Sequence, residues 1–297
     1  MNAFPFSGTG VALVTPFKTD FTVDEESLYR IVQHVIKGGV DYLVALGTTS
    51  EAPVLSKYEK DLVLDTIRQA NAGRLPVVLG IGGNNTSAIV DQLENTHFDG
   101  IDAILSVTPY YNKPGQQGLF EHYDALARAC PVPMILYNVP GRTAVNMKAV
   151  TTLSLAHKHR NIVAVKEASG DLQQIMAIIA DKPDHFEVIS GDDAITLPLL
   201  AVGACGVISV AANAFTRDFS NMVRTQLSGD HDTALELQYK MLKLYDLLFA
   251  EGSPAGVKAM LQLMDLCENV VRLPLTTISN DLRQQIATYE TYLITNK

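Results

Sequence analysis

The sequence predicts an α/β fold, a (β/α)8 TIM barrel with a C-terminal helical appendix. Short apolar runs rich in β-branched residues alternate with amphipathic helical stretches, about one βα unit apart. None of these runs alternates between apolar and polar residues as a half-exposed antiparallel strand does. The strands are therefore expected to be parallel and buried on both faces, and eight βα units can close on themselves into a barrel.

Eight runs are expected to form the strands. They are Val11–Val14, Tyr42–Leu46, Val77–Gly80, Ala103–Val107, Met134–Tyr137, Ile162–Val165, Glu187–Ile189 and Val207–Val210. A doubly wound sheet is the competing fold, and it more often carries a glycine-rich dinucleotide-binding turn after its first strand. The stretch from Gly80 to Asn85 has Asn85 where the last glycine of that motif is required, which favours the barrel.

Capping patterns mark two of the predicted helix starts. Thr22 to Glu25 and Ser56 to Glu59 both have the spacing of a capping box. Beyond Gly229 there is no strand run, and the three helical patterns there are Asp230–Ala250, Ala255–Cys267 and Asn280–Ile294. We therefore expect a catalytic barrel domain over residues 1–229 and a helical region packed on it over residues 230–297.

Composition and charge limit the possible partners. The 297 residues are 47% hydrophobic and 19% charged, which is ordinary for a globular protein. The chain has 23 Lys and Arg against 32 Asp and Glu, a formal net charge of −9. This acidic balance disfavours phosphate backbones and anionic lipid, so neither nucleic acid nor a membrane is an expected partner.

Compartment is inferred from the N-terminus, one uncharged stretch and the cysteines. The N-terminus shows no signal-peptide pattern. The uncharged residues 194–216 are interrupted by Pro198, Gly203 and Gly206, so we interpret them as a short helix and a strand rather than a membrane span. The three cysteines, at positions 130, 205 and 267, are far apart and lack metal-ligand spacing, so we expect reduced thiols in a cytoplasmic protein.

Polar residues follow the predicted strands, and in a barrel of this kind the C-terminal strand ends carry the chemistry. These residues are Gly47 to Glu51 after the second strand, Thr108 to Asn112 after the fourth, Tyr137 to Arg142 after the fifth, Lys166 and Glu167 after the sixth, Ser190 to Asp193 after the seventh, and Ser209 in the eighth. We expect Asp192 and Asp193 to cap the next helix rather than bind a metal, because no third ligand follows at a useful spacing.

Lys166 carries the sharpest functional hypothesis, because it closes a run, Ile162–Val165, that should be buried on both faces. A lysine amine attacks a carbonyl carbon only when it has lost its proton, and burial favours the neutral form. The competing interpretation is a structural lysine that reaches water from the strand end or pairs with Glu167.

Hydroxyl and guanidinium groups complete the candidate set. Tyr137, Thr48 and Thr49 are expected at neighbouring strand ends, where hydroxyls can pass protons while a carbinolamine forms and loses water. Taken singly, each is better explained as a structural residue than as a catalytic one. Arg142, after a Pro-Gly turn, suits either a substrate carboxylate or a surface ion pair.

These motifs resemble the ordered signatures of the dihydrodipicolinate synthase family. The segments that carry the resemblance are Gly47–Glu51, Thr108–Pro114, Tyr137–Thr143, Val165–Gly170, Ser190–Asp193 and Gly206–Val210, and together they extend along essentially the whole chain. The wider family is that of the class I pyruvate-dependent aldolases, which includes N-acetylneuraminate lyase. Arg142 is similar to the carboxylate-binding arginine of the synthases, a position at which the sugar acid lyases generally differ.

The resemblance implies a lyase of lysine and diaminopimelate biosynthesis that condenses pyruvate with L-aspartate-4-semialdehyde, without cofactor or metal. Lys166 would form the Schiff base with pyruvate, and Thr48, Tyr137 and Tyr111 of the partner subunit would relay protons. Thr49 would hold the pyruvate carboxylate and Arg142 the semialdehyde carboxylate, while Gly191 and Ile208 would shape the lysine pocket through their backbones. The resemblance also implies a homotetramer, a dimer of dimers.

Alternatives remain open at this point. Another lyase of the family, acting on a 2-keto-3-deoxy sugar acid or N-acetylneuraminate, would use the same lysine. A metal-dependent aldolase would need a His/carboxylate cluster, which the predicted strand ends lack, and a non-catalytic binding barrel would have no use for the lysine, tyrosine and arginine together. Ser50 and Ala52 depart from the commonest family pattern and put local loop contacts in question, not the paired threonines.

Inhibition by L-lysine, the end product of the implied pathway, is not expected. The cleft that binds L-lysine in sensitive relatives resembles this chain at Tyr110 and Asn84. Elsewhere in that cleft Lys57 and Lys60 stand in the place of histidines, and Ala88 in that of a glutamate. Bound lysine would lose an acceptor and meet added positive charge.

Overall fold

The computed structural model describes residues 4–295, with side chains as far as residue 289. Its eight parallel strands follow one another in chain order in a closed barrel, which confirms the predicted fold class. The strands are β1 (Gly8–Ala12), β2 (Tyr42–Ala45), β3 (Val77–Gly80), β4 (Ala103–Val107), β5 (Met134–Asn138), β6 (Ile162–Glu167), β7 (Glu187–Ser190) and β8 (Gly206–Ser209). Two compact units make up the described chain: unit 1 holds residues 76–208 and the segment before Gly8, and unit 2 holds residues 8–75 and those from 209 onward.

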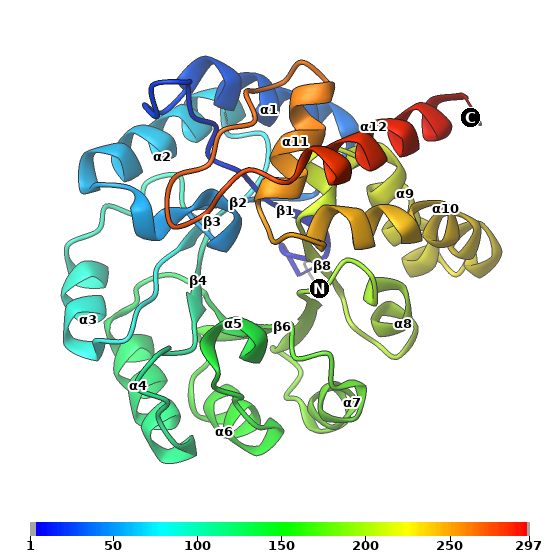
Figure 1. The fold of residues 1–297 in the computed structure, drawn as a ribbon. Helices are drawn as coiled ribbons and strands as arrows, with labels where there is room; N and C mark the ends of the chain where they lie inside the picture. Colours follow the sequence, from blue (N-terminus) through cyan, green and yellow to red (C-terminus); the bar gives the residue numbers. More distant parts are fainter. Residues whose placement is uncertain (1–3, 296–297) are drawn as a thin grey trace. The chain divides into compact units, whose positions relative to one another are not determined.

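Unit 1 carries the strands from β3 to Ile208 of β8. Each strand pairs in parallel with the next, and in the β5–β6 pair Tyr137 lies opposite Lys166 while Asn138 lies opposite Glu167. The helices of this unit are α3 (Thr86–Glu94), α4 (Gln116–Ala129), α5 (Pro140–Thr143), α6 (Ala149–Lys158), α7 (Leu172–Asp181) and α8 (Thr196–Ala201). Figure 1 shows α3, α4, α6 and α7 in succession along the outside of these strands.

Unit 2 contains the first two strands and the C-terminal helices. Its helices are α1 (Glu25–Gly38), α2 (Lys57–Asn71), α9 (Thr216–Ser228), α10 (His231–Phe249), α11 (Ala255–Leu263) and α12 (Asn280–Thr295). Within the unit, α1 packs on α2, α9 packs on β1 and on α10, and α10, α11 and α12 contact one another (Figure 1). The predicted helical appendix is therefore present, whereas its proposed boundary at residues 229 and 230 stays a prediction.

The strands agree closely with their sequence pattern, with one exception. β3 and β4 have the predicted bounds, and β6 continues two residues beyond its apolar run to include Lys166 and Glu167. The first strand begins at Gly8 instead of Val11. The sequence prediction missed its start because Gly8, Thr9 and Gly10 are not apolar, although all three are buried: a Cβ on Gly10 would lie 2.2 Å from the Tyr42 ring.

One of the two predicted capping boxes is present. Ser56 accepts a hydrogen bond from the Glu59 N–H, and the Glu59 carboxylate accepts one from the Ser56 N–H at the start of α2. The box predicted at Thr22 is wrong. Residues 22 and 23 are extended, because Val23 forms an antiparallel bridge with Phe17, so α1 starts later and is capped by Asp24.

The stretch from 194 to 216 divides as the sequence predicts, into the short helix α8 and the strand β8. Over the residues that the structure describes, no helix has the length and apolar character needed to cross a membrane. Cys130, Cys205 and Cys267 are free thiols, and Cys130 and Cys267 are buried.

Candidate active site

Lys166 lies at the carboxyl end of β6 and is 5% exposed. Its Nζ atom lies 4.3 Å from the centroid of the Tyr137 ring, and Tyr137, on the neighbouring strand, is itself 6% exposed. The ring face therefore meets the amine, in a cation–π contact when the amine carries its proton. The lysine does not reach out to solvent, so the structure rejects one of the two structural alternatives for it.

The position of Glu167 excludes the other alternative, an ion pair between Lys166 and Glu167. Neighbouring residues of a strand point to opposite faces, and Glu167 is fully buried on the face away from Lys166. Its Oε1 accepts hydrogen bonds from Asn138 Nδ2 at 2.9 Å and Gln174 Nε2 at 3.2 Å. Its Oε2 accepts from the Ser169 hydroxyl at 2.7 Å and the Ser169 N–H at 3.3 Å.

Asn138 extends this network to the loop before α6. Its Oδ1 accepts from the Met147 N–H at 2.9 Å, and its Nδ2 donates to Asn146 Oδ1 at 2.8 Å. Asn146 in turn donates to Gln174 Oε1 at 2.9 Å. The ends of β5 and β6 and the start of α7 are thus joined by side-chain amides that converge on one carboxylate.

Burial raises the pKa of Glu167 above its ordinary value, and the hydrogen bonds from Ser169, Asn138 and Gln174 oppose this shift only in part. The carboxyl group is thus held by geometry in an environment that penalises its charge. A backbone fixed in this way also fixes the direction in which the adjacent residue, Lys166, projects.

Gly191, after β7, is the close neighbour of the lysine side chain. A Cβ built at this position would lie 3.1 Å from Lys166 Cε and 2.8 Å from the Ala168 Cβ. The Gly191 N–H donates to the Glu167 carbonyl at 2.7 Å, which brings the two chain segments this close. Ile208, the other residue expected to shape the pocket by its backbone, is buried in β8.

Arg142 is exposed on the single-turn helix α5, which directly follows β5. Hydrogen bonds fix this turn. The Arg142 N–H donates to the Val139 carbonyl at 2.9 Å, and the buried Thr143 hydroxyl lies within hydrogen-bond distance of the carbonyls of Val139 and Val145. Thr108, at the end of β4, donates to the Thr143 hydroxyl at 3.3 Å. Arg142 is therefore an exposed residue on a rigid turn next to the end of β5.

Tyr110 and Tyr111 follow β4 and are exposed. Tyr111 is 89% exposed and adopts a φ of 74°, in the left-handed region that a non-glycine residue seldom occupies. The Tyr110 carbonyl accepts a hydrogen bond from Asn84 Nδ2 at 3.3 Å. The structure thus brings Lys166 and Tyr137 together and places the Tyr111 side chain in solvent.

The threonine pair belongs to unit 2, where Thr48–Ser50 form a 3-10 turn directly after β2. Thr49 is buried and Thr48 is exposed. The Ser50 hydroxyl donates to the Gly47 carbonyl at 2.7 Å, and the Glu51 N–H donates to the Thr48 carbonyl at 3.2 Å. Both ends of the turn are closed by these bonds.

Asp192 does not cap α8 as predicted. The helix begins at Thr196 with Ile195 in the cap position, and Asp192 Oδ1 instead accepts from the Ala194 N–H at 3.0 Å. The Asp192 side chain therefore closes a turn in the loop, with the residue two positions further on, instead of capping the helix. Within residues 4–295, no group of three His, Cys, Asp or Glu side chains is placed to hold a metal ion.

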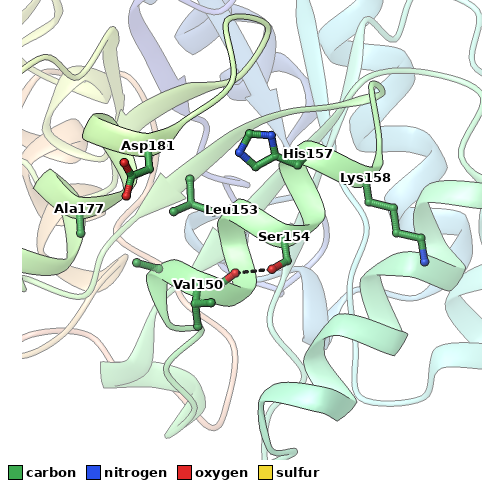
Figure 2. A pocket seen from close by; sticks show the side chains of 8 residues that line it. Val150, Leu153, Ser154, His157, Lys158, Ala177 and Asp181 are labelled. Atoms are coloured by element: carbon green, nitrogen blue, oxygen red, sulfur yellow. Dashed lines mark hydrogen bonds between the residues drawn. The ribbon is translucent and has the colours of Figure 1, made fainter.

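A surface groove of unit 1 lies apart from these strand ends, between α6 and α7 (Figure 2). Val150 and Leu153 form its apolar wall, and Asp181 on α7 lies on the same side as His157, whereas the Lys158 side chain points away from Asp181. None of the candidate catalytic residues lines it.

The sequence prediction missed the groups that hold the candidate residues in place. Asn138, Glu167 and Gln174 stand next to predicted residues, yet nothing in their order indicates that they converge. In the sequence Glu51 is only the last residue of a motif, and its order in the chain does not indicate its buried partner, Lys258. A lysine inside the apolar stretch from Ala255 to Leu263 is the signal that could have identified it.

The class of the protein is a β/α-barrel enzyme: a buried lysine and a tyrosine ring lie side by side at the carboxyl ends of two neighbouring strands, where barrels of this kind carry their active sites. Residues 5–291 match the model of the dihydrodipicolinate synthetase family. The chain is 53% identical over 281 residues to a 4-hydroxy-tetrahydrodipicolinate synthase of Flavobacterium psychrophilum, covering 95% of this chain and 96% of that one. The chain belongs to the dihydrodipicolinate synthetase family.

Solved structures agree with this assignment. A dihydrodipicolinate synthase from Thermotoga maritima superposes with a TM-score of 0.95 at 35% identity, covering 98% of this chain and 99% of that one. A chloride-inhibited dihydrodipicolinate synthase from Acinetobacter baumannii, complexed with pyruvate, gives a TM-score of 0.93 at 38% identity, covering 97% and 98%.

Glu167→Gln is expected to remove a pH dependence of stability. Because burial raises the pKa of Glu167, the folded protein keeps this proton at pH values at which the unfolded chain has released it. The free energy of unfolding of the unaltered protein therefore falls as the pH rises from the ordinary glutamate range through the raised pKa, and the variant, which cannot ionise there, lacks this decline.

Urea unfolding of both proteins over a series of pH values measures the difference. Glu94→Gln, at an exposed position of α3, is the matched control and should follow the unaltered protein. An equal decline in the Glu167→Gln protein would contradict the expectation.

Proposed function

We propose that the chain catalyses the reaction of 4-hydroxy-tetrahydrodipicolinate synthases, the condensation of pyruvate with L-aspartate-4-semialdehyde in lysine and diaminopimelate biosynthesis. The observation that carries the proposal is the buried Lys166 against the Tyr137 ring, in a chain of this family. The reaction needs a neutral amine, proton donors beside it, and groups that bind the carboxylates of the two substrates.

Lys166 is the nucleophile. Its neutral amine adds to C2 of pyruvate, the resulting carbinolamine loses water, and an imine remains. Loss of a proton from C3 then gives an enamine, whose carbon attacks the aldehyde of the semialdehyde. Hydrolysis or cyclisation through the substrate's own amine releases the lysine, so no cofactor or metal takes part.

Hydroxyl groups move the protons in these steps. The position of Tyr137, with its ring against the lysine amine, supports a role in proton transfer. Thr48 and Tyr111 of the partner subunit complete the relay, and Thr49 binds the pyruvate carboxylate. Gly191 leaves room beside Lys166 Cε, and its backbone shapes the lysine pocket together with that of Ile208.

Arg142 binds the carboxylate of the second substrate. Arg142 is an exposed residue on a rigid turn, and both substrates are anions. Arg142 adds a positive charge at the site of a protein of net charge −9, which favours the entry of an anion there.

A second candidate function is cleavage of a 2-keto-3-deoxy sugar acid or N-acetylneuraminate by the same lysine. Arg142 after Pro140-Gly141 favours the synthase reaction, as does the shared name of relatives at 52% and 53% identity. Steady-state rates with pyruvate and aspartate semialdehyde, compared with sialic acid and keto-deoxygluconate, decide between the two.

Assembly and compartment belong to the same proposal. We expect a cytoplasmic homotetramer, a dimer of dimers, in which Tyr111 enters the site of its neighbour. Its 89% exposure and its left-handed φ of 74° support this role, since both leave a tyrosine ring projecting from the single chain.

Borohydride in the presence of pyruvate is expected to inactivate the protein and leave a reduced three-carbon adduct on Lys166, because only an imine is reduced in this way. Peptide mapping by mass spectrometry locates the adduct. An adduct on another lysine, or none, would remove the mechanism, and Lys166→Ala is the control that should not be labelled.

Arg142→Ala is expected to lose turnover with aspartate semialdehyde while it still forms the pyruvate imine. Loss of a charge-assisted bond costs roughly 1.5 to 3 kcal/mol, or about tenfold to more than a hundredfold in kcat/KM for the second substrate. If trapping of pyruvate by borohydride falls to the same extent, Arg142 serves the first substrate or the fold.

Mixing two inactive variants tests the Tyr111 assignment. In a dimer that exchanges Tyr111, a chain with Tyr111→Ala and a chain with Lys166→Ala together form one intact site. Random assortment after mild dissociation should restore about a quarter of the unaltered activity. No recovery from mixed dimers, seen as such by native mass spectrometry, would place Tyr111 in the site of its own chain.

L-lysine is expected not to inhibit appreciably. Ala88 lacks the acceptor of sensitive relatives, and Lys57 and Lys60 add positive charge. Loss of one charge-assisted bond of roughly 1.5 to 3 kcal/mol already weakens binding at least tenfold. A titration measures it, and half-inhibition by submillimolar L-lysine would contradict the expectation.

A further inference from the structure

Lys258 on α11 is a fully buried lysine that the proposed reaction does not use. Its Nζ donates to Glu51 Oε1 at 2.5 Å and to the Val270 carbonyl at 2.8 Å. The same atom lies 4.2 Å from the centroid of the Phe17 ring. The ammonium thus directs its bonds to the protein itself, so Lys258 is not a second nucleophile.

Glu51 is held by both of its carboxylate oxygens. Oε1 accepts from Lys258, and Oε2 accepts from the Arg272 N–H at 2.9 Å. The side chain of Glu51 is 1% exposed, and Lys258 and Arg272 both come from the C-terminal part of unit 2. One carboxylate therefore connects the end of the 3-10 turn after β2 to Lys258, which lies 207 residues further along the chain.

The backbone of Glu51 explains why this tie matters for the turn. Glu51 ends the 3-10 turn Thr48–Ser50 with a φ of 57°, a left-handed conformation that surrounding contacts must impose on a residue with a side chain. Its N–H closes the turn on the Thr48 carbonyl at 3.2 Å. The backbone of Glu51 thus closes the turn, while its carboxylate is held by Lys258 and Arg272.

Arg272 braces the same region from a second direction. Its guanidinium lies 4.3 Å from the Phe17 ring centroid and donates to the Val54 carbonyl at 3.0 Å. It also forms an ion pair with Glu59, which lowers the pKa of Glu59 to about 2. Phe17 is therefore in contact with two cations, Lys258 and Arg272, that both bond to residues at the end of the turn or beyond it.

A buried ion pair is a poor means of gaining stability alone, because the loss of hydration cancels much of the attraction. Its two charges do, however, fix a geometry, since each is satisfied in few arrangements. Burial lowers the pKa of Lys258, while the charge and hydrogen bond of Glu51 oppose that shift. The pair therefore holds its charges only while Glu51 stays in place.

We propose that Lys258 is a positioning residue for the Thr48–Thr49 turn, acting through the buried carboxylate of Glu51. This inference rests on the proposed function, in which Thr49 binds the carboxylate of pyruvate. Lys258 touches no substrate. It sets the position of the turn, and with it the affinity for the keto acid.

The double variant Lys258→Met/Glu51→Gln tests the proposal, because it removes both charges and leaves no unpaired buried ion. Its melting temperature should exceed that of Lys258→Met alone. The pyruvate concentration that gives half-maximal borohydride labelling of Lys166 should nevertheless rise at least tenfold, with labelling still complete at saturation. Half-maximal labelling within twofold of the unaltered protein would overturn the proposal.

Glu51→Asp is the second variant and serves if the double variant does not fold. It keeps both charges but shortens the tie by one methylene, so the pair can form only if the turn moves. We expect the half-saturating pyruvate concentration to rise while the apparent KM for aspartate semialdehyde at saturating pyruvate stays the same. An unchanged value for pyruvate in a folded Glu51→Asp protein would also overturn the proposal.

Two controls separate the possible failures. Lys240→Met/Asp218→Asn removes a partly exposed ion pair between α10 and α9 and should change neither melting temperature nor pyruvate labelling appreciably. The unaltered protein, treated with pyruvate and borohydride in parallel, tests the proposed function itself. Without an adduct there the function fails, whereas an adduct with equal pyruvate dependence in all variants rejects only the role of Lys258.

Discussion

The structure depends on the directions in which strand β6 points two adjacent ionisable side chains, Lys166 and Glu167, both of which are buried. Alternation along the strand sends Lys166 and Glu167 to opposite faces. On one face the carboxylate meets donors from Asn138, Ser169 and Gln174, and on the other the amine meets the Tyr137 ring. The acid is thereby prevented from neutralising the lysine as an ion pair, and its bonds fix the backbone from which the lysine projects.

The fold and the order of the strand-end motifs could be predicted because both depend on short segments of sequence. A parallel strand buried on both faces is a continuous apolar run, and β3 and β4 match their runs residue for residue. The prediction failed where burial is achieved without apolar residues, as in Gly8 to Gly10, and where tertiary pairing overrides a local signal. The extended bridge between Val23 and Phe17 is such a case, since it prevents Thr22 from capping α1.

The groups that support the site could not be predicted in the same way, because their partners are distant in sequence. Glu51 and Lys258 are 207 residues apart, and Asn138 and Glu167 are 29 apart. Each of these residues is polar in a buried position, which is unusual and therefore informative. Sequence alone shows that such a residue needs a partner, but only the fold shows which partner it has.

The two buried lysines differ in the bonds that they already form, and this difference supports the separate roles that we propose for them. Lys258 donates to a carboxylate and a carbonyl and covers an aromatic ring, so substrate could reach it only by breaking an ion pair. Lys166 is nearly as buried, yet the contact that the described residues provide for its ammonium is a ring face, which forms no covalent or hydrogen bond that a substrate must displace. At Lys258 the carboxylate of Glu51 offsets part of the cost of burying the ammonium, because a buried cation without a counter-ion is costly. Burial alone therefore does not distinguish the two lysines. Within residues 4–295, Lys258 forms an ion pair with an acid and Lys166, at the end of β6, forms none, which supports the role of nucleophile that we propose for Lys166.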